Sequence, residues 1–321
     1  MTVKPLAKHV LSQELRLYFA NLTSALLDES NDEYRSAALA SLRSEPGLHQ
    51  LVPYFVQFVA DKVTHNIKNI LTLTSMMHLV AAMLENPHLY LDPYVSALIP
   101  SILTCLIGRN LGPSITPAST PSDHLTSYPL RDLAASILKS IAKQYSASSR
   151  TLKPRLARTC LKHFLDPSKP LATNYGGIIG LQAIGNAAEI TRSIIVPNLK
   201  TFGDLILKDA FTAAGAAASA GEGDQQQQQQ QQVKEGKKKE AEVIMRTLVQ
   251  AIAEVDGSDT LAVAGAAATS ITAAPSGEEE GEALIGKLRD SAGETVAEKV
   301  VEMGDRRLVE KLVKLLDEVG N

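Results

Sequence analysis

Few residue patterns in this chain support enzymatic chemistry. Its seven histidines include no His-Glu-x-x-His pair, and its two cysteines, Cys105 and Cys160, are 55 residues apart and lack metal-ligand spacing. The segment Gly176-Gly177-x-x-Gly180 resembles a phosphate-binding loop, but no predicted strand precedes it and no Lys-Ser/Thr follows it. We therefore predict that the protein is not an enzyme and has no catalytic residue, metal ligand or cofactor.

A cluster of positive charge is the strongest functional candidate. No Asp or Glu occurs between Leu133 and Leu165, whereas Lys and Arg recur through this range. We define a candidate partner-binding basic surface by six of these residues: Lys139, Lys143, Arg150, Arg155, Arg158 and Lys162. It could bind an acidic protein segment or a nucleic-acid backbone, or it could be only a solvated outer face. Because no aromatic residue is interleaved between Arg155 and Lys162, an acidic protein segment is favoured over DNA.

A repeated proline indicates which elements position these residues. Similar apolar segments contain Pro53, Pro100, Pro154 and Pro197, which are separated by 47, 54 and 43 residues. A period of about 40–47 residues is typical of helical-pair solenoids of the HEAT or armadillo kind. We predict an all-α HEAT-repeat solenoid of about nine helices, with the four prolines inside helices that they kink.

Helical periodicity places the basic residues on two of these helices. Residues 129–145 and 150–165 each have apolar residues at helical spacing, and Arg155, Arg158 and Lys162 fall opposite the apolar stripe of the second helix. An insertion loop rich in Gly, Pro, Ser and Thr is predicted at 109–124. Each glycine of 176–185 weakens its own helix by about 1 kcal/mol, a cost that implies tight packing at this place. We therefore expect these glycines to allow close approach of a neighbouring helix.

Composition changes after residue 211. Residues 1–211 contain 20 Lys and Arg against 15 Asp and Glu, whereas residues 212–321 contain 12 against 20, so a basic part precedes an acidic one. We predict a solenoid over 1–211, a flexible low-complexity Ala/Gly/Gln/Lys linker over 212–240, and an acidic, partly helical tail over 241–321. The two unpaired cysteines indicate a reducing compartment. No apolar run reaches the ~18 residues of a membrane span.

Five stretches together resemble one known family. The chain is similar to the C-terminal HEAT-repeat part of subunit 6 of the general transcription factor TFIID, a TATA-binding-protein-associated factor that some organisms share with the SAGA coactivator. The stretches that carry the resemblance are 5–19, 87–91, 98–105, 130–135 and 174–181, with Pro100, Arg131, Asp132, Tyr175, Gly176, Gly180 and Pro197 as marker residues.

The resemblance implies a nuclear, non-catalytic scaffold of the RNA polymerase II initiation machinery. Its HEAT domain would contact other TFIID or SAGA subunits, and no membrane is implied. The family's N-terminal histone fold, which pairs with the subunit 9 histone fold, is not found in this sequence, so that partner is expected only if a longer protein contains the fold. The alternatives are an unrelated HEAT-repeat adaptor and a nucleic-acid-binding solenoid that uses residues 139–162.

Overall fold

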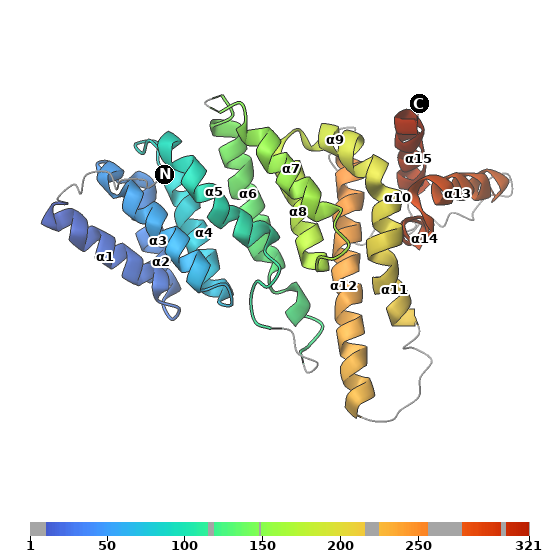
Figure 1. Cartoon of the computed structure of the whole chain (residues 1–321), viewed down its shortest axis with the longest axis horizontal. Helices are drawn as coiled ribbons and strands as arrows, with labels where there is room; N and C mark the ends of the chain where they lie inside the picture. Colours follow the sequence, from blue (N-terminus) through green and yellow to red (C-terminus); the bar gives the residue numbers. More distant parts are fainter. Residues whose placement is uncertain are drawn as a thin grey trace. The chain divides into compact units, whose positions relative to one another are not determined.

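The structure is a computed structural model that describes residues 11–114, 119–147, 149–215, 225–255, 278–302 and 306–320. Within these ranges every regular element is a helix (Figure 1). None of these helices is long and apolar enough to cross a membrane. The chain divides into two compact units, the first made of residues 1–114 and 129–152, the second of residues 115–128 and 153–321. The all-α prediction is confirmed for the described residues.

The first unit is a succession of packed helices. They are α1 (Gln13–Leu27), α2 (Asp32–Ser44), α3 (Val52–His65), α4 (Ile70–Glu85), α5 (Asp92–Ile107) and most of α6 (Tyr128–Gln144). Their starts follow local sequence signals. The side chains of Ser12, Asn31 and Asn69 accept backbone N–H bonds at the starts of α1, α2 and α4. Prolines occupy the first turns of α3 and α5, where a missing N–H leaves no bond unmade.

Helices of the first unit pack against helices that follow them directly in the chain and against helices further away in the chain. Helix α3 contacts both α4 and α5, and α4 also contacts α1 and α2. Phe55 of α3 is fully buried, with its ring 5.3 Å from that of Phe19 on α1. Contacts to helices one to three positions away are what a stack of helix pairs produces, because each pair packs against the neighbouring pair.

Two buried polar side chains close the ends of helices in the first unit. Asn86 donates to the carbonyls of Leu42 and Glu45 at 2.6 and 3.1 Å, at the end of α2. Arg131 of α6 is 1% exposed and donates to the carbonyls of Leu106 and Gly108 at 2.6 and 2.8 Å, at the end of α5. The last carbonyls of a helix lack intrahelical partners, so these side chains supply them.

The second unit contains α7 (Leu152–Phe164) from residue 153 onward and α8 (Leu171–Ile184), which are joined by a short turn. A longer irregular helical stretch follows, made of α9 (Ala187–Ile190), α10 (Leu199–Phe202) and α11 (Lys208–Gly215). Two π-helical turns, Thr191–Ile195 and Gly203–Leu207, interrupt it. Together with the eight preceding helices, this stretch accounts for the helices predicted from the sequence up to residue 211.

Helices α7 and α8 approach each other closely at Gly177. A Cβ atom added there would lie 2.8 Å from the backbone nitrogen of Phe164 and 2.9 Å from the carbonyl oxygen of Cys160. The Asn174 side chain, one turn earlier, donates to the carbonyls of His163, Phe164 and Asp166 and so caps the end of α7. The prediction that glycine permits close helix packing here is confirmed at Gly177.

The positions of the repeat prolines differ from the prediction. Only Pro100 lies inside a regular helix, α5. Pro53 occupies the first turn of α3, and Pro154 is the third residue of α7. Pro197 lies in the short 3₁₀ turn Val196–Asn198, directly after the first π-helical turn. The first N–H groups of a helix need no intrahelical acceptor, so Pro53 and Pro154 lie at helix starts and do not kink their helices.

The region after residue 211 also differs from the sequence-based expectation. Helix α11 extends to Gly215, and α12 (Gln225–Glu254) includes residues 225–240 of the expected linker, whereas residues 216–224 lie outside the described residues. Glutamine and lysine are good helix formers, so the tract can extend the amphipathic helix that follows it. Helix α12 contacts α8, α9, α11 and the short turn Asp123–Leu125. There the buried His124 ring lies against Gly236, with Nδ1 3.7 Å from a carboxylate oxygen of Glu240.

The remaining helices also belong to the second unit. They are α13 (Glu278–Ala292), α14 (Glu294–Glu302) and α15 (Arg306–Gly320). Helix α15 is strongly amphipathic, with Leu308, Leu312 and Leu315 buried, and it contacts α12, α13 and α14. Lys311 donates to the carbonyl of Ala253 at 2.6 Å, at the end of α12. The helical pattern predicted near the C-terminus is therefore present and packed.

Candidate partner-binding site

Helix α6 carries the first part of the basic surface. Its apolar residues Leu130, Ala134, Ile137, Leu138 and Ile141 are buried, which fixes the rotation of the helix about its axis. Lys139 and Lys143 are exposed on the remaining face, and Arg150 is exposed in the turn before α7. All three belong to the first unit.

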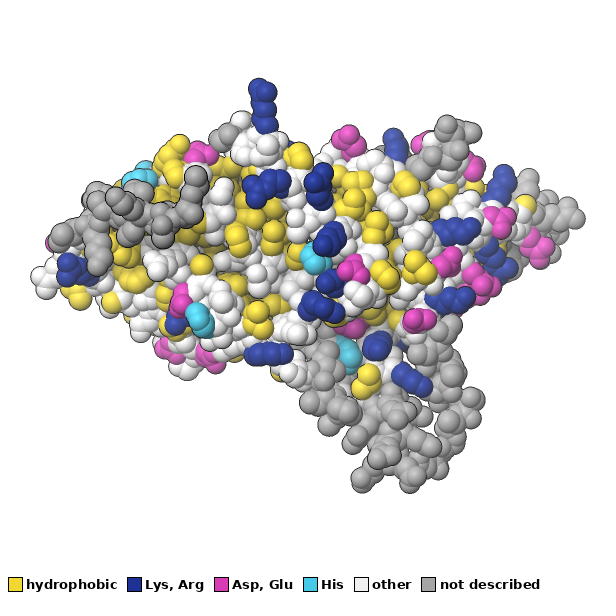
Figure 2. Space-filling view, viewed as in Figure 1, with side chains coloured by type: hydrophobic (Ala, Val, Ile, Leu, Met, Phe, Trp, Pro, Cys, Tyr) yellow, Lys and Arg dark blue, Asp and Glu magenta, His cyan; other side chains and the backbone are white. Residues whose placement is uncertain are grey.

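Helix α7 carries the second part. Leu156, Cys160 and Phe164 are buried along one stripe, and Arg155, Arg158 and Lys162 are exposed, as the helical spacing predicted. Lys and Arg side chains gather over α7 on the face shown in Figure 2. These three residues belong to the second unit. Their use by one partner stays a prediction.

The electrostatics around α7 reflect this excess of positive charge. Burial lowers the pKa of His163, and the positive charges of Lys169 and Lys162 lower it further. The pKa of the Asp166 carboxyl is also lowered, first by hydrogen bonds from the Ser168 side chain and backbone and then by Lys169. No ion pair links any of the six basic-surface residues to a carboxylate in the part of the chain that the structure describes.

The cysteines are placed as core residues. Both are buried, and burial raises the pKa of each thiol to about 12, opposed at Cys105 by the positive charge of Arg131. The reactive thiolate is therefore scarce at neutral pH. Among the described residues, no three His, Cys, Asp or Glu side chains are grouped so as to hold a metal ion.

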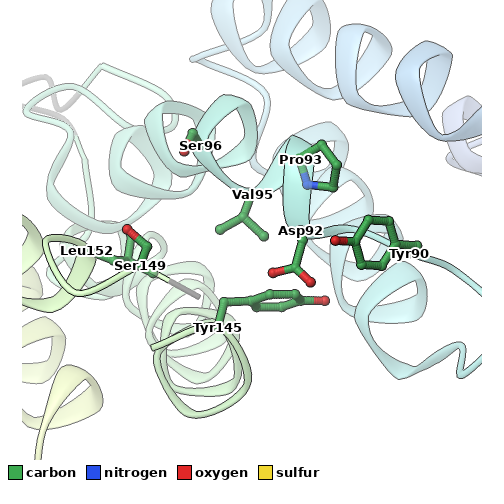
Figure 3. Close-up of a pocket in the computed structure, with 8 residues that line it drawn as sticks. All are labelled: Tyr90, Asp92, Pro93, Val95, Ser96, Tyr145, Ser149 and Leu152. Atoms are coloured by element: carbon green, nitrogen blue, oxygen red, sulfur yellow. The ribbon is translucent and has the colours of Figure 1, made fainter. Parts of the chain in front are cut away.

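Sequence reasoning missed one site, a pocket of about 340 Å³ in the first unit (Figure 3). It is lined by Tyr90, Asp92, Pro93, Val95, Ser96, Tyr145, Ser149 and Leu152. The residues come from the start of α5 and from the end of α6 with the turn that follows. The two groups are separated by about 50 residues in the sequence, so no local motif marks the pocket.

Four of the seven marker residues of the family resemblance are buried in the helix packing. Arg131 is the buried cap of α5, and Tyr175, Gly176 and Gly180 are buried in α8. The Tyr175 ring lies 4.6 Å from that of Tyr128 in the same unit. Pro100, Asp132 and Pro197 are exposed. The buried markers therefore support helix packing.

Paired helices at a repeat length of about 40–47 residues are typical of a HEAT-repeat protein. The chain matches the family described as the TAF6 C-terminal HEAT repeat domain over residues 7–200, which is more than half of its length. It belongs to this family.

Known relatives support the same assignment. The chain is 51% identical over 206 residues to the SAGA complex/transcription factor TFIID complex subunit Taf6 of Schizosaccharomyces pombe, covering 64% of this chain and 44% of that protein. It is 40% identical over 199 residues to transcription initiation factor TFIID subunit 6 of Arabidopsis thaliana, covering 62% of this chain and 34% of that protein. The chain thus spans less than half the length of these relatives.

A solved structure is also similar. The TAF6 C-terminal domain from Antonospora locustae is 29% identical, with a TM-score of 0.47, and the match covers 59% of this chain and 92% of that one.

Proposed function

We propose that this chain is a non-catalytic scaffold subunit of the RNA polymerase II transcription initiation machinery, acting in the nucleus through its HEAT domain. Membership in the TAF6 C-terminal HEAT repeat family carries this proposal. The relatives named above are subunits of TFIID, and the fission yeast relative is named as a subunit of both SAGA and TFIID. The partners are therefore other subunits of a TFIID or SAGA assembly.

The basic surface is the contact that we assign to a partner. Arg155, Arg158 and Lys162 are exposed on one face of α7, whose opposite face is buried, so their charges are available to another molecule. Charge of one sign on a rigid helix face steers and orients a partner of opposite charge. An acidic segment of a neighbouring subunit fits this chemistry.

Affinity purification with charge reversal tests the proposal. The tagged full-length protein is purified from nuclear extract of its own cells, and the co-purifying proteins are identified by mass spectrometry. We expect TFIID or SAGA subunits with the natural sequence, and at least tenfold less of one subunit when Arg155, Arg158 and Lys162 are changed to Glu.

A matched control separates this contact from a general effect of net charge. Lys287, Arg289 and Lys314 are also exposed, and their change to Glu alters the net charge by the same amount. This control should retain the full set of subunits. If the natural protein recovers no such subunit, the scaffold role is refuted; if both variants behave alike, the assignment of the basic surface is refuted.

A further inference from the structure

The pocket of the first unit combines aromatic rings with one carboxylate. Tyr90 is 59% exposed beside the cavity, so its ring is accessible to another molecule. Figure 3 shows the Asp92 carboxylate between the Tyr90 and Tyr145 side chains. Val95 and Leu152 are buried and form an apolar wall, and Ser96 and Ser149 are exposed. The cavity, about 340 Å³, falls within the range of ~300–1,000 Å³ typical of ligand pockets.

The Asp92 charge acts inside this pocket. Burial raises the pKa of the Tyr145 hydroxyl, and the negative charge of Asp92 raises it further, as expected for a carboxylate close to the phenol. No described Lys or Arg forms an ion pair with Asp92. The carboxylate therefore remains available to a cation from outside.

A purely structural role explains only part of this arrangement. Asp92 is the first residue of α5, where a negative charge stabilises the helix N-terminus. Asp32 occupies the same position in α2, where its carboxylate pairs with Arg35 of the same helix. The helix start does not account for the exposed Tyr90 ring or for the cavity between the two tyrosines.

We propose that this pocket binds an arginine side chain of a partner protein. A guanidinium group is planar and stacks on tyrosine faces, and its paired N–H groups match the two oxygens of a carboxylate. Its aliphatic stem would lie on Val95 and Leu152. The basic residues Lys139, Lys143 and Arg150 belong to the same unit, so the arginine is flanked by acidic residues in the partner. The acidic flanks rest on the proposed function, whereas the arginine site rests on the pocket alone.

A titration followed by nuclear magnetic resonance tests the arginine site. The ¹⁵N-labelled full chain is titrated with N-acetyl-arginine amide, with its neutral analogue N-acetyl-citrulline amide, and with N-acetyl-trimethyllysine amide. We expect saturable shifts of the Asp92, Ser96 and Tyr145 amide signals with arginine and at least tenfold weaker binding of citrulline. Asp92→Asn should weaken arginine binding at least fivefold, whereas the matched helix-start variant Asp32→Asn should leave it unchanged.

Several outcomes overturn the proposal. Absence of saturation with arginine, equal binding of citrulline, or an equal effect of Asp32→Asn each excludes a carboxylate-based arginine site, and tighter binding of trimethyllysine excludes arginine as the preferred cation. A parallel titration with hexaglutamate reports on the amides of Lys139, Lys143 and Arg150. Shifts at these amides without arginine binding at the pocket refute the arginine site and leave the acidic-partner proposal standing. Arginine binding at the pocket without shifts at these amides leaves the arginine site standing and refutes the acidic-partner proposal.

Discussion

Helices α8 and α13 both contain helical glycines, but the glycines have opposite surroundings. In α8, Gly177 faces the backbone of α7 at distances below those that real Cβ atoms show. In α13, Gly286 has no atom within 4 Å of an added Cβ. The first glycine makes a helix contact possible, and the second only weakens the helix that contains it. Glycine in a helix is therefore informative only together with its neighbours.

The same contrast extends to the regions that contain these helices. The repeat body, residues 11–215, ends its helices with buried polar side chains such as Asn86, Arg131 and Asn174. The C-terminal helices α12–α15 bury apolar stripes, as at Leu248 and Leu312, and among their described charged side chains only Glu240 is buried. Substitutions of the same type should therefore have different effects in the two regions.

Replacement of arginine should show the largest difference. Arg131→Met removes the hydrogen bonds to the buried carbonyl of Leu106 and the half-buried carbonyl of Gly108, so we expect a loss of about 3 kcal/mol in the free energy of unfolding. Arg289 of α13 is exposed, and Arg289→Met should change stability by less than about 0.5 kcal/mol. Urea unfolding followed by circular dichroism measures both; equal effects would contradict the assigned role of Arg131.

The two glycines should respond to alanine with opposite signs. Gly177→Ala gains helix propensity but forces α7 and α8 apart, for a net loss of about 1–2 kcal/mol. Gly286→Ala meets no neighbour and should stabilise α13 by about 0.5–1 kcal/mol. Thermal unfolding of the two variants, measured side by side, checks the signs. A stabilised Gly177→Ala protein would mean that α7 and α8 are not in close contact.

Thiol chemistry should report on the repeat body alone, because Cys105 and Cys160 are the only cysteines of the chain and both lie there. At pH 8 both thiols should be labelled slowly by a disulfide reagent in the folded protein and rapidly in urea. Labelling of Cys160, which lies beside Gly177, should be faster in Gly177→Ala and unchanged in Gly286→Ala. Rapid labelling of the folded natural protein would show that these thiols are accessible.

The same thiols make stability depend on pH in the alkaline range. The folded pKa of each is raised to about 12, so the unfolded chain loses these protons at lower pH than the folded one. Stability should be unaffected well below pH 9 and fall as pH rises from about 9 toward 12, by at most ~1.4 kcal/mol per thiol and pH unit. Replacing both cysteines with alanine should remove this slope, and urea unfolding at pH 8 and 9.5 measures it.

The helices of the repeat body could be predicted because their signals are local. Apolar residues at helical spacing, caps such as Asn31 and Asn69, and the repeated proline lie within single segments of the chain. The exposure of Arg155, Arg158 and Lys162 followed from the same spacing. The basic surface as one partner-binding site and the domain boundary at 211 stay predictions.

The features that could not be predicted depend on contacts between distant residues. The pocket joins Tyr90 to Tyr145, and the caps join Asn86 to Leu42 and Arg131 to Leu106. Helix α12 also packs against α8 and the turn at His124, contacts between distant segments that composition does not encode. The π-helical turns near Pro197 have no sequence signal that we identify.

The buried caps also have a consequence for biosynthesis. In each case the capping residue follows the helix that it closes, so Asn86 completes α2, Arg131 completes α5 and Asn174 completes α7. As the chain leaves the ribosome from its N-terminus, each of these helices has unpaired terminal carbonyls until the cap has been synthesised. Vectorial synthesis would therefore complete these helices one after another, in the order in which they occur in the chain.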